Sequence, residues 1–264
     1  MEEEKIEIKV ELDEVTNKFL LHLKQVTNCL THIYNAIDKS DFDIYKLLPT
    51  DSFPIVINDK KPKLTINEQK RITLNWILTK AFEDFIIGLT KSFKETYKYL
   101  RIYSLSQEPK QTRTRENIQN ELQKIEIDNE KFHIPDFIEK IEKLLKQPLP
   151  LKEEVLSVNQ LRNCLVHRHG TVGEKDIKNS PTGDLRLKWI SLKFWTAKDG
   201  QQNEITHDFR KDGVIVDNLS CETIRNEKIF IIGNKISLDI NEFNGIAYTC
   251  ATFANGLFPL MPRP

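Results

Sequence analysis

Apolar residues recur every three or four positions along most of the chain, a pattern typical of amphipathic helices. One of the helices that it predicts begins with Thr65 and Glu68 at the spacing of a capping box, and Pro135 favours the first turn of another. Four main helices are predicted, over residues 12–38, 65–101, 135–146 and 152–168. The core stripe expected for the second of them consists of Ile72, Trp76, Phe82, Ile86, Leu89, Phe93, Tyr97 and Leu100.

The pattern changes after residue 172. Residues 185–195 alternate between apolar and polar with period two, as in a half-buried strand, and Asp199 with Gly200 is a turn signal. Asp239, with Glu242 three positions later, can cap a closing helix. Further strand candidates are residues 205–209, 214–216 and 228–232.

These patterns together predict a mainly α protein. We expect an up-and-down helical bundle over residues 1–172 and an antiparallel β insertion of three or four strands over residues 184–236. The closing helix and tail, residues 237–264, would pack back on the bundle. The strongly charged residues 106–131 are expected to be a connection, either mobile or helical.

Composition limits the classes of function. The 39 basic and 39 acidic residues cancel, so no global positive field indicates nucleic acid, and any contact with RNA must be local to a cleft. The four cysteines are scattered without a C-x-x-C pair, which favours reduced thiols. No apolar run approaches the roughly 18 residues that span a bilayer, and no secretory signal stands out. We therefore expect a soluble, cytoplasmic protein with no membrane partner.

Candidate chemistry lies at the end of the predicted helix 152–168. Arg162 is followed directly by Asn163, His167 comes five positions after Arg162, and Gly170 suits the left-handed stop just past the helix. A guanidinium can bind phosphate through two parallel hydrogen bonds, and a histidine can transfer protons near neutral pH. Metal-free cleavage of RNA needs both kinds of group.

This stretch resembles the motif of the HEPN superfamily of all-helical ribonucleases. That motif is R-x(4–6)-H, usually with a polar residue after the arginine, near the end of the fourth major helix, and Arg162, Asn163 and His167 meet it. The resemblance covers residues 12–172 and the last helix. It implies a homodimer whose paired motifs form a composite, metal-independent endoribonuclease site that needs no cofactor. It also implies a toxin or antiviral effector that cuts RNA, with a possible antitoxin or regulatory partner.

The resemblance assigns a role to each motif residue. Arg162 would bind and polarise the scissile phosphate, His167 would transfer a proton or align the 2′-hydroxyl, and Asn163 would orient both by hydrogen bonding. His169 occupies the position where a subgroup silenced by nucleotidylation carries a tyrosine, so silencing of that kind is not expected. His169 is either a second acid or base or an RNA-contacting group, or an ordinary loop residue beside Gly170.

Two further residues are supporting candidates. Arg168 would add a phosphate contact. Glu83, on the predicted helix 65–101, would orient the catalytic groups, although it could equally be a solvated partner of Lys80 or Lys91.

Three alternatives stay open. Arg162 and His167 could be ordinary solvated residues of a surface helix. The protein could also be a non-catalytic HEPN module that dimerises and binds RNA, a nucleotide or a partner protein, although binding alone does not require arginine, asparagine and histidine together. A metal-dependent hydrolase using His167 and His169 is disfavoured, since no carboxylates stand nearby at ligand spacing. No metal site is predicted.

Overall fold

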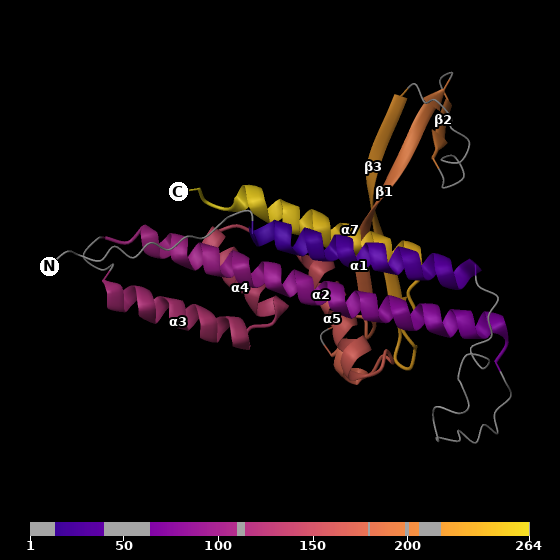
Figure 1. The fold of residues 1–264 in the computed structure, drawn as a ribbon, viewed down its shortest axis with the longest axis horizontal. Coiled ribbons are helices and arrows are strands. Elements are labelled where there is room, and N and C mark those ends of the chain that lie inside the picture. Colours follow the sequence, from indigo (N-terminus) through magenta and orange to yellow (C-terminus); the bar gives the residue numbers. More distant parts are fainter. Residues whose placement is uncertain are drawn as a thin grey trace.

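The chain is mainly helical, with a small antiparallel sheet before its last helix (Figure 1). The computed structural model describes residues 14–39, 64–109, 114–178, 180–198, 201–205 and 218–263. The helices are α1 (Glu14–Lys39), α2 (Ile66–Ser106), α3 (Arg115–Lys131), α4 (Ile134–Leu145), α5 (Lys152–His167), α6 (Glu174–Ile177) and α7 (Ile240–Leu257), followed by a 3₁₀ turn, Phe258–Leu260. The strands are β1 (Leu185–Lys198), β2 (Gln201–Glu204) and β3 (Asn218–Phe230).

Two of the expected helix starts are present as capping boxes, while the start expected at residue 12 lies outside the described residues. The Thr65 hydroxyl accepts the backbone N–H of Glu68, whose carboxylate accepts the N–H of Thr65 in return, so the capping box is formed. Asp239 and Glu242 form the same arrangement at the start of α7. Local sequence thus determines where these two helices begin.

The charged segment 106–131 contains a regular helix, α3, which is held on α2 by polar contacts. The Tyr97 hydroxyl donates to Asp128 at 2.6 Å and accepts from Arg101, also at 2.6 Å. Arg101 forms a further ion pair with Glu121. Burial, followed by the hydrogen bond to Asp128, raises the pKa of Tyr97 to about 12, so the phenol keeps the proton that it donates.

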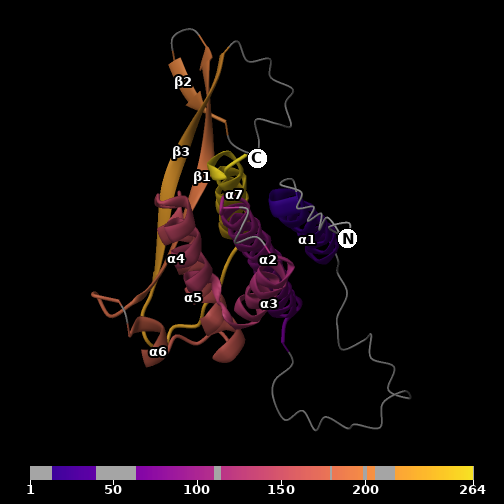
Figure 2. The same ribbon diagram turned by 90° about the vertical axis from the view of Figure 1, so that its left-hand side faces the viewer.

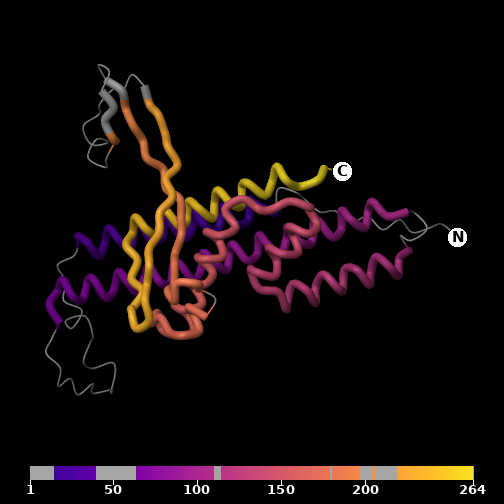
Figure 3. The backbone as a smooth tube through the Cα atoms, turned by 180° about the vertical axis from the view of Figure 1, so that it is seen from behind, coloured from indigo at the N-terminus to yellow at the C-terminus, as the bar shows by residue number. Residues whose placement is uncertain are grey.

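The core stripe of α2 is predicted correctly from Phe82 onward but is wrong at its beginning. Phe82, Ile86, Leu89, Phe93, Tyr97 and Leu100 are buried. Ile72 is instead 51% exposed and Trp76 61% exposed. The reason is the length of α2, whose first turns run beside α1 past the other helices and are therefore covered on one side only (Figures 1 and 3).

The sheet has the strand order β2-β1-β3, with both pairs antiparallel. β1 and β3 pair along almost their whole length, from Leu185 with Phe230 to Ala197 with Asn218, and this ribbon projects beyond the helices (Figure 2). Of the candidate 228–232, only residues 228–230 lie in a strand; they are the end of β3, which begins ten residues earlier. The candidate 205–209 begins where β2 has ended, and residues 206–209 and 214–216 lie outside the described residues.

The base of the ribbon is anchored in the bundle through β1. On the edge away from β3, β1 pairs with β2 only over residues 195–198. Nearer its start, the N–H of Lys188 donates to the Ser157 hydroxyl of α5 at 2.9 Å, and the N–H of Ile190 donates to the Thr249 hydroxyl of α7 at 2.8 Å. Two helix side chains thus satisfy backbone donors that a further strand would otherwise take.

A glycine allows α7 to lie close to β1. A Cβ atom at Gly245 would come within 2.4 Å of Cδ1 of Trp189, so only a residue without a side chain fits against this indole. Among the described residues, no helix is long and apolar enough to cross a membrane.

Candidate functional site

The motif helix α5 forms one wall of a cleft of about 630 Å³. The cleft is also lined by α2, from Ile86 to Lys94, and by residues 132–134 at the junction of α3 and α4. Figure 2 shows α4 and α5 beside α2 and α3, with α6 at the foot of the sheet. The volume is in the range of small-ligand sites. The polar and charged side chains lining the cleft are Thr90, Lys91, Lys94, His133, Asn159, Arg162, Asn163, His167, Arg168 and Lys175.

The charge of this cleft is one-sided. Its described lining contains five lysine or arginine residues and two histidines, but no aspartate or glutamate. The whole chain has a net charge of zero, so the positive charge is concentrated locally. A concave surface lined by charges of one sign attracts ligands of the opposite sign. The arrangement therefore suits phosphate groups.

Arg162 and Asn163 are in direct contact in the cleft. Nη1 of Arg162 donates to Oδ1 of Asn163 at 3.2 Å, so the amide restrains the guanidinium. Nε of Arg162 is buried and has no hydrogen-bond partner among the described residues. A buried donor without a partner is costly, and a ligand oxygen in the cleft could remove that cost.

His167 is the last residue of α5 and is exposed on the cleft. The chain then reverses through His169 and Gly170, with φ of 51° and 73°. The backbone N–H of Gly170 donates to the backbone carbonyl of Cys164 in α5 at 3.1 Å. The carbonyl of Gly170 accepts the N–H of Ile236 at 2.7 Å. The left-handed stop at Gly170 is thus present, and the loop behind the motif is fixed between α5 and the segment after β3. His169 is exposed and does not line the cleft.

Arg168 lines the cleft, but a buried carboxylate holds its guanidinium. Nε donates to Oδ2 of Asp176 at 2.6 Å and Nη2 donates to the other carboxylate oxygen. Oδ2 of Asp176 also accepts the N–H of Gly173 at 2.9 Å. The hydrogen bond to Asp176 raises the pKa of Arg168, and burial followed by Asp176 raises the pKa of the Cys164 thiol to about 11. Arg168 therefore links α5 to α6, which carries Lys175.

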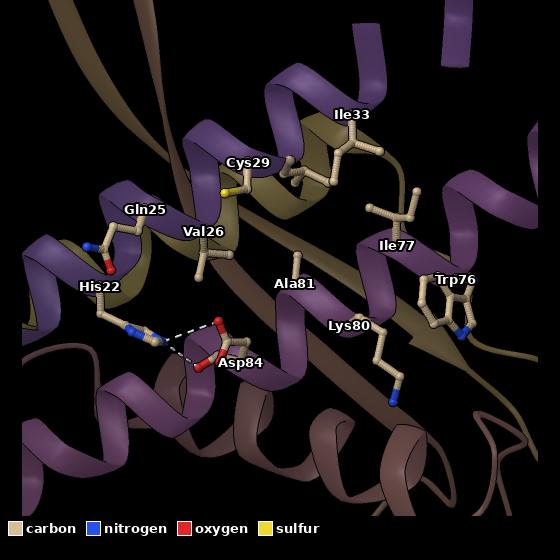
Figure 4. Close-up of a pocket in the computed structure, with 11 residues that line it drawn as sticks. His22, Gln25, Val26, Cys29, Ile33, Trp76, Ile77, Lys80, Ala81 and Asp84 are labelled. Atoms are coloured by element: carbon tan, nitrogen blue, oxygen red, sulfur yellow. Dashed lines mark hydrogen bonds and ion pairs between the residues drawn. The ribbon is translucent and has the colours of Figure 1, made fainter. Parts of the chain in front are cut away.

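Glu83 lies outside this cleft, one helical turn before its α2 wall begins. Its carboxylate accepts from Lys80 at 2.7 Å, which matches the alternative of a solvated pair. Lys80 lines a second groove, of about 360 Å³, between α1 and α2 (Figure 4). There the His22 ring lies 3.0 Å from the backbone oxygen of Asp84. This mostly apolar groove contains none of the expected site residues.

The structure adds site residues that sequence reasoning missed. Lys91 and Lys94 reach the cleft from α2, Lys175 from α6, and His133 from the start of α4. Lys91 and Lys94 fall three positions apart, a spacing that gives one helix face, and this was a usable signal. His133 and Lys175 carry no local signal, because only the tertiary fold brings them beside the motif.

No protein-family model, curated protein or solved structure matches the chain. The site is thus defined by its own geometry, a cationic cleft on the motif helix of a mainly helical protein. Among the described residues, no three histidine, cysteine, aspartate or glutamate side chains gather to hold a metal ion. In particular, His167 and His169 lack the third ligand that a hydrolytic zinc site would need.

Proposed function

We propose that this protein is a metal-independent endoribonuclease of the HEPN type that cuts RNA in the cleft around Arg162, Asn163 and His167. The observation that carries the proposal is the charge of the cleft, where every ionisable side chain of the described lining is lysine, arginine or histidine. RNA presents a continuous row of phosphates to such a surface, and these phosphates dominate affinity in nucleic-acid binding.

The proposed reaction uses only groups of the protein and the RNA. Arg162 holds the non-bridging oxygens of the scissile phosphate, with Asn163 restraining its guanidinium. The 2′-oxygen loses its proton and bonds to phosphorus, while the bond from phosphorus to the 5′-oxygen breaks and that oxygen gains a proton. His167 takes part in one of these proton transfers. The products carry a 2′,3′-cyclic phosphate and a 5′-hydroxyl.

The assembly and biological role in this proposal come from the resemblance. A second copy would bring its motif to the same site, giving a composite active site in a homodimer. RNA cleavage would slow growth, as expected of a toxin or antiviral effector, and a neutralising antitoxin or regulatory partner would restrain it.

The proposal is tested with Arg162→Ala and His167→Ala, assayed on cellular RNA. Each should lower the cleavage rate by about 10²-fold or more, the scale of losing an electrostatic or proton-transfer group. Matched controls are Arg71→Ala and His32→Ala, which change exposed residues of α2 and α1 away from the cleft. If Arg162→Ala and His167→Ala cut RNA as fast as the wild type, these two residues are not catalytic. A wild type that binds RNA in the cleft without cutting it would favour the non-catalytic module.

A further inference from the structure

His133 brings a second histidine into the cleft from outside the motif. It is the N-cap of α4, and its backbone N–H donates to Oδ2 of Asp136 at 2.9 Å. This cap fixes the position of the residue at the junction of α3 and α4, and its side chain is exposed on the cleft. The motif residues Arg162 and His167 line the same cleft from α5.

Cleavage by the 2′-hydroxyl needs two proton transfers at opposite ends of one phosphate. A base must remove the proton from the 2′-oxygen, and an acid must protonate the departing 5′-oxygen. One histidine performs both transfers only by moving its proton between the two oxygens. In the proposed homodimer, the second histidine is therefore either the partner subunit's His167 or a further histidine of the same protomer. Two histidines that reach the cleft from different helices can perform one transfer each, with the phosphate held by Arg162.

We propose that His133 is the second proton-transfer residue and that it acts with His167 of the same protomer. This inference rests on the proposed ribonuclease function. In the reaction, one histidine accepts the 2′-hydroxyl proton as the 2′-oxygen bonds to phosphorus. The other donates a proton to the 5′-oxygen as its bond to phosphorus breaks, so no metal and no further reactant is consumed.

The surroundings of His133 fit this role. The charged groups that line the same cleft are Lys91 and Lys94 of α2, Arg162 and His167 of α5, Arg168 at the end of α5 and Lys175 of α6. Asp136 lies on the helix that His133 caps, and its carboxylate accepts the backbone N–H of His133. Apart from Asp136 these groups are cationic or histidine. A bound phosphate would supply the negative charge next to the ring, and the surrounding cations would hold that phosphate in place.

The first test is the pH dependence of cleavage by His133→Asn. Asparagine is a preferred N-cap residue, so α4 should still begin at the same place, which circular dichroism checks. The wild type should show a bell-shaped pH profile from two titrating groups. The variant should lose about 10²-fold in kcat, change KM little, and lose one limb of the bell. His32→Asn, on the exposed face of α1, is the matched control and should retain rate and profile.

The outcomes separate this inference from the proposed function. If the wild type cuts RNA and His133→Asn keeps its rate and both limbs, His133 is not the second group, while the proposed function stands. If the wild type cuts no RNA at all, the proposed function fails and the inference fails with it.

A second test asks whether both histidines act in one protomer. His133→Asn and His167→Asn are co-expressed with different tags and the mixed assembly is purified. No protomer in it carries both histidines, so cleavage should stay as low as in either variant alone. Activity that returned in the mixture would overturn the same-protomer arrangement, because it would require His133 of one copy to work with His167 of the other.

Discussion

Arg162 is the residue on which charge, burial and hydrogen bonding converge. Its Nη1 is engaged by Asn163, its Nε is buried without a partner among the described residues, and its side chain lines the cationic cleft. A buried donor without an acceptor lowers the stability of the folded protein by about 1 to 3 kcal/mol. In the proposed function, a phosphate oxygen bound in the cleft supplies the acceptor that this donor lacks.

Arg162→Lys tests the role of the guanidinium fork at the residue scale. Lysine keeps the positive charge but cannot offer two parallel hydrogen bonds to a phosphate. We expect kcat/KM for RNA cleavage to fall by about 10²-fold, against little change in Arg71→Lys. The measurement is steady-state kinetics on a defined oligoribonucleotide. If lysine supports wild-type cleavage, charge alone is enough and the fork has no special role.

At the scale of elements, the attachment of β1 to two helices holds the sheet in place. Ser157 of α5 and Thr249 of α7 accept backbone N–H groups on the edge of β1 that β2 does not reach. Thr249 is completely buried and also donates to the carbonyl of Gly245 at 2.7 Å. Its hydroxyl therefore bridges α7 and β1 where water cannot substitute for it.

Thr249→Val should destabilise the protein through this bridge. Valine has nearly the same shape, but it leaves the buried N–H of Ile190 without an acceptor, at a cost of about 1 to 3 kcal/mol. Thr249→Ser is the matched control, because it keeps the hydroxyl and removes only a methyl group. Urea denaturation measures both free energies of unfolding. If Thr249→Val is as stable as the wild type, the bridge contributes nothing to the free energy of unfolding.

At the scale of the whole molecule, a neutral chain carries a strongly cationic cleft. No acidic side chain belongs to the described lining of the cleft, although Asp176 pairs with Arg168 beside it. RNA affinity should therefore depend on a few phosphate contacts rather than on a global field. Lys91 and Lys94 on α2 are well placed for such contacts, since neither has an ion pair with a described residue.

The salt dependence of RNA binding tests this distribution of charge. With His167→Ala as a non-cleaving background, Lys91→Ala together with Lys94→Ala should weaken binding of single-stranded RNA. Each lost phosphate contact should make the slope of log affinity against log salt shallower by about 0.7. Lys24→Ala together with Lys124→Ala changes two exposed lysines outside the cleft and is the matched control. If the two double variants show equal salt slopes, the RNA binds outside the cleft.

The sequence predicted those parts of the molecule that local chemistry determines. Helix starts at Thr65 and Asp239 follow from capping boxes, and the apolar spacing in α2 correctly marks its core stripe from Phe82 to Leu100 as buried. Periodicity alone cannot tell which part of a long helix has neighbours. For that reason Ile72 and Trp76 were predicted to be in the core, whereas the first turns of α2 are covered on one side only.

The candidate site was predictable only along one helix. Arg162, Asn163 and His167 are close in sequence, so the motif placed them together before any tertiary structure was considered. His133 and Lys175 reach the same cleft from separate helices, and Asp176 engages Arg168 from α6. Contacts of this kind depend on how the helices pack, which the spacing of residues along the chain does not specify.

In the proposed function, the cleft cuts RNA without a metal. The most direct measurement incubates the purified protein with RNA in EDTA, compares the wild type with His167→Ala, and analyses the chemistry of the product ends. We expect cleavage by the wild type alone, with 2′,3′-cyclic phosphate and 5′-hydroxyl ends. Cleavage that EDTA abolishes, or that persists unchanged in His167→Ala, would contradict it.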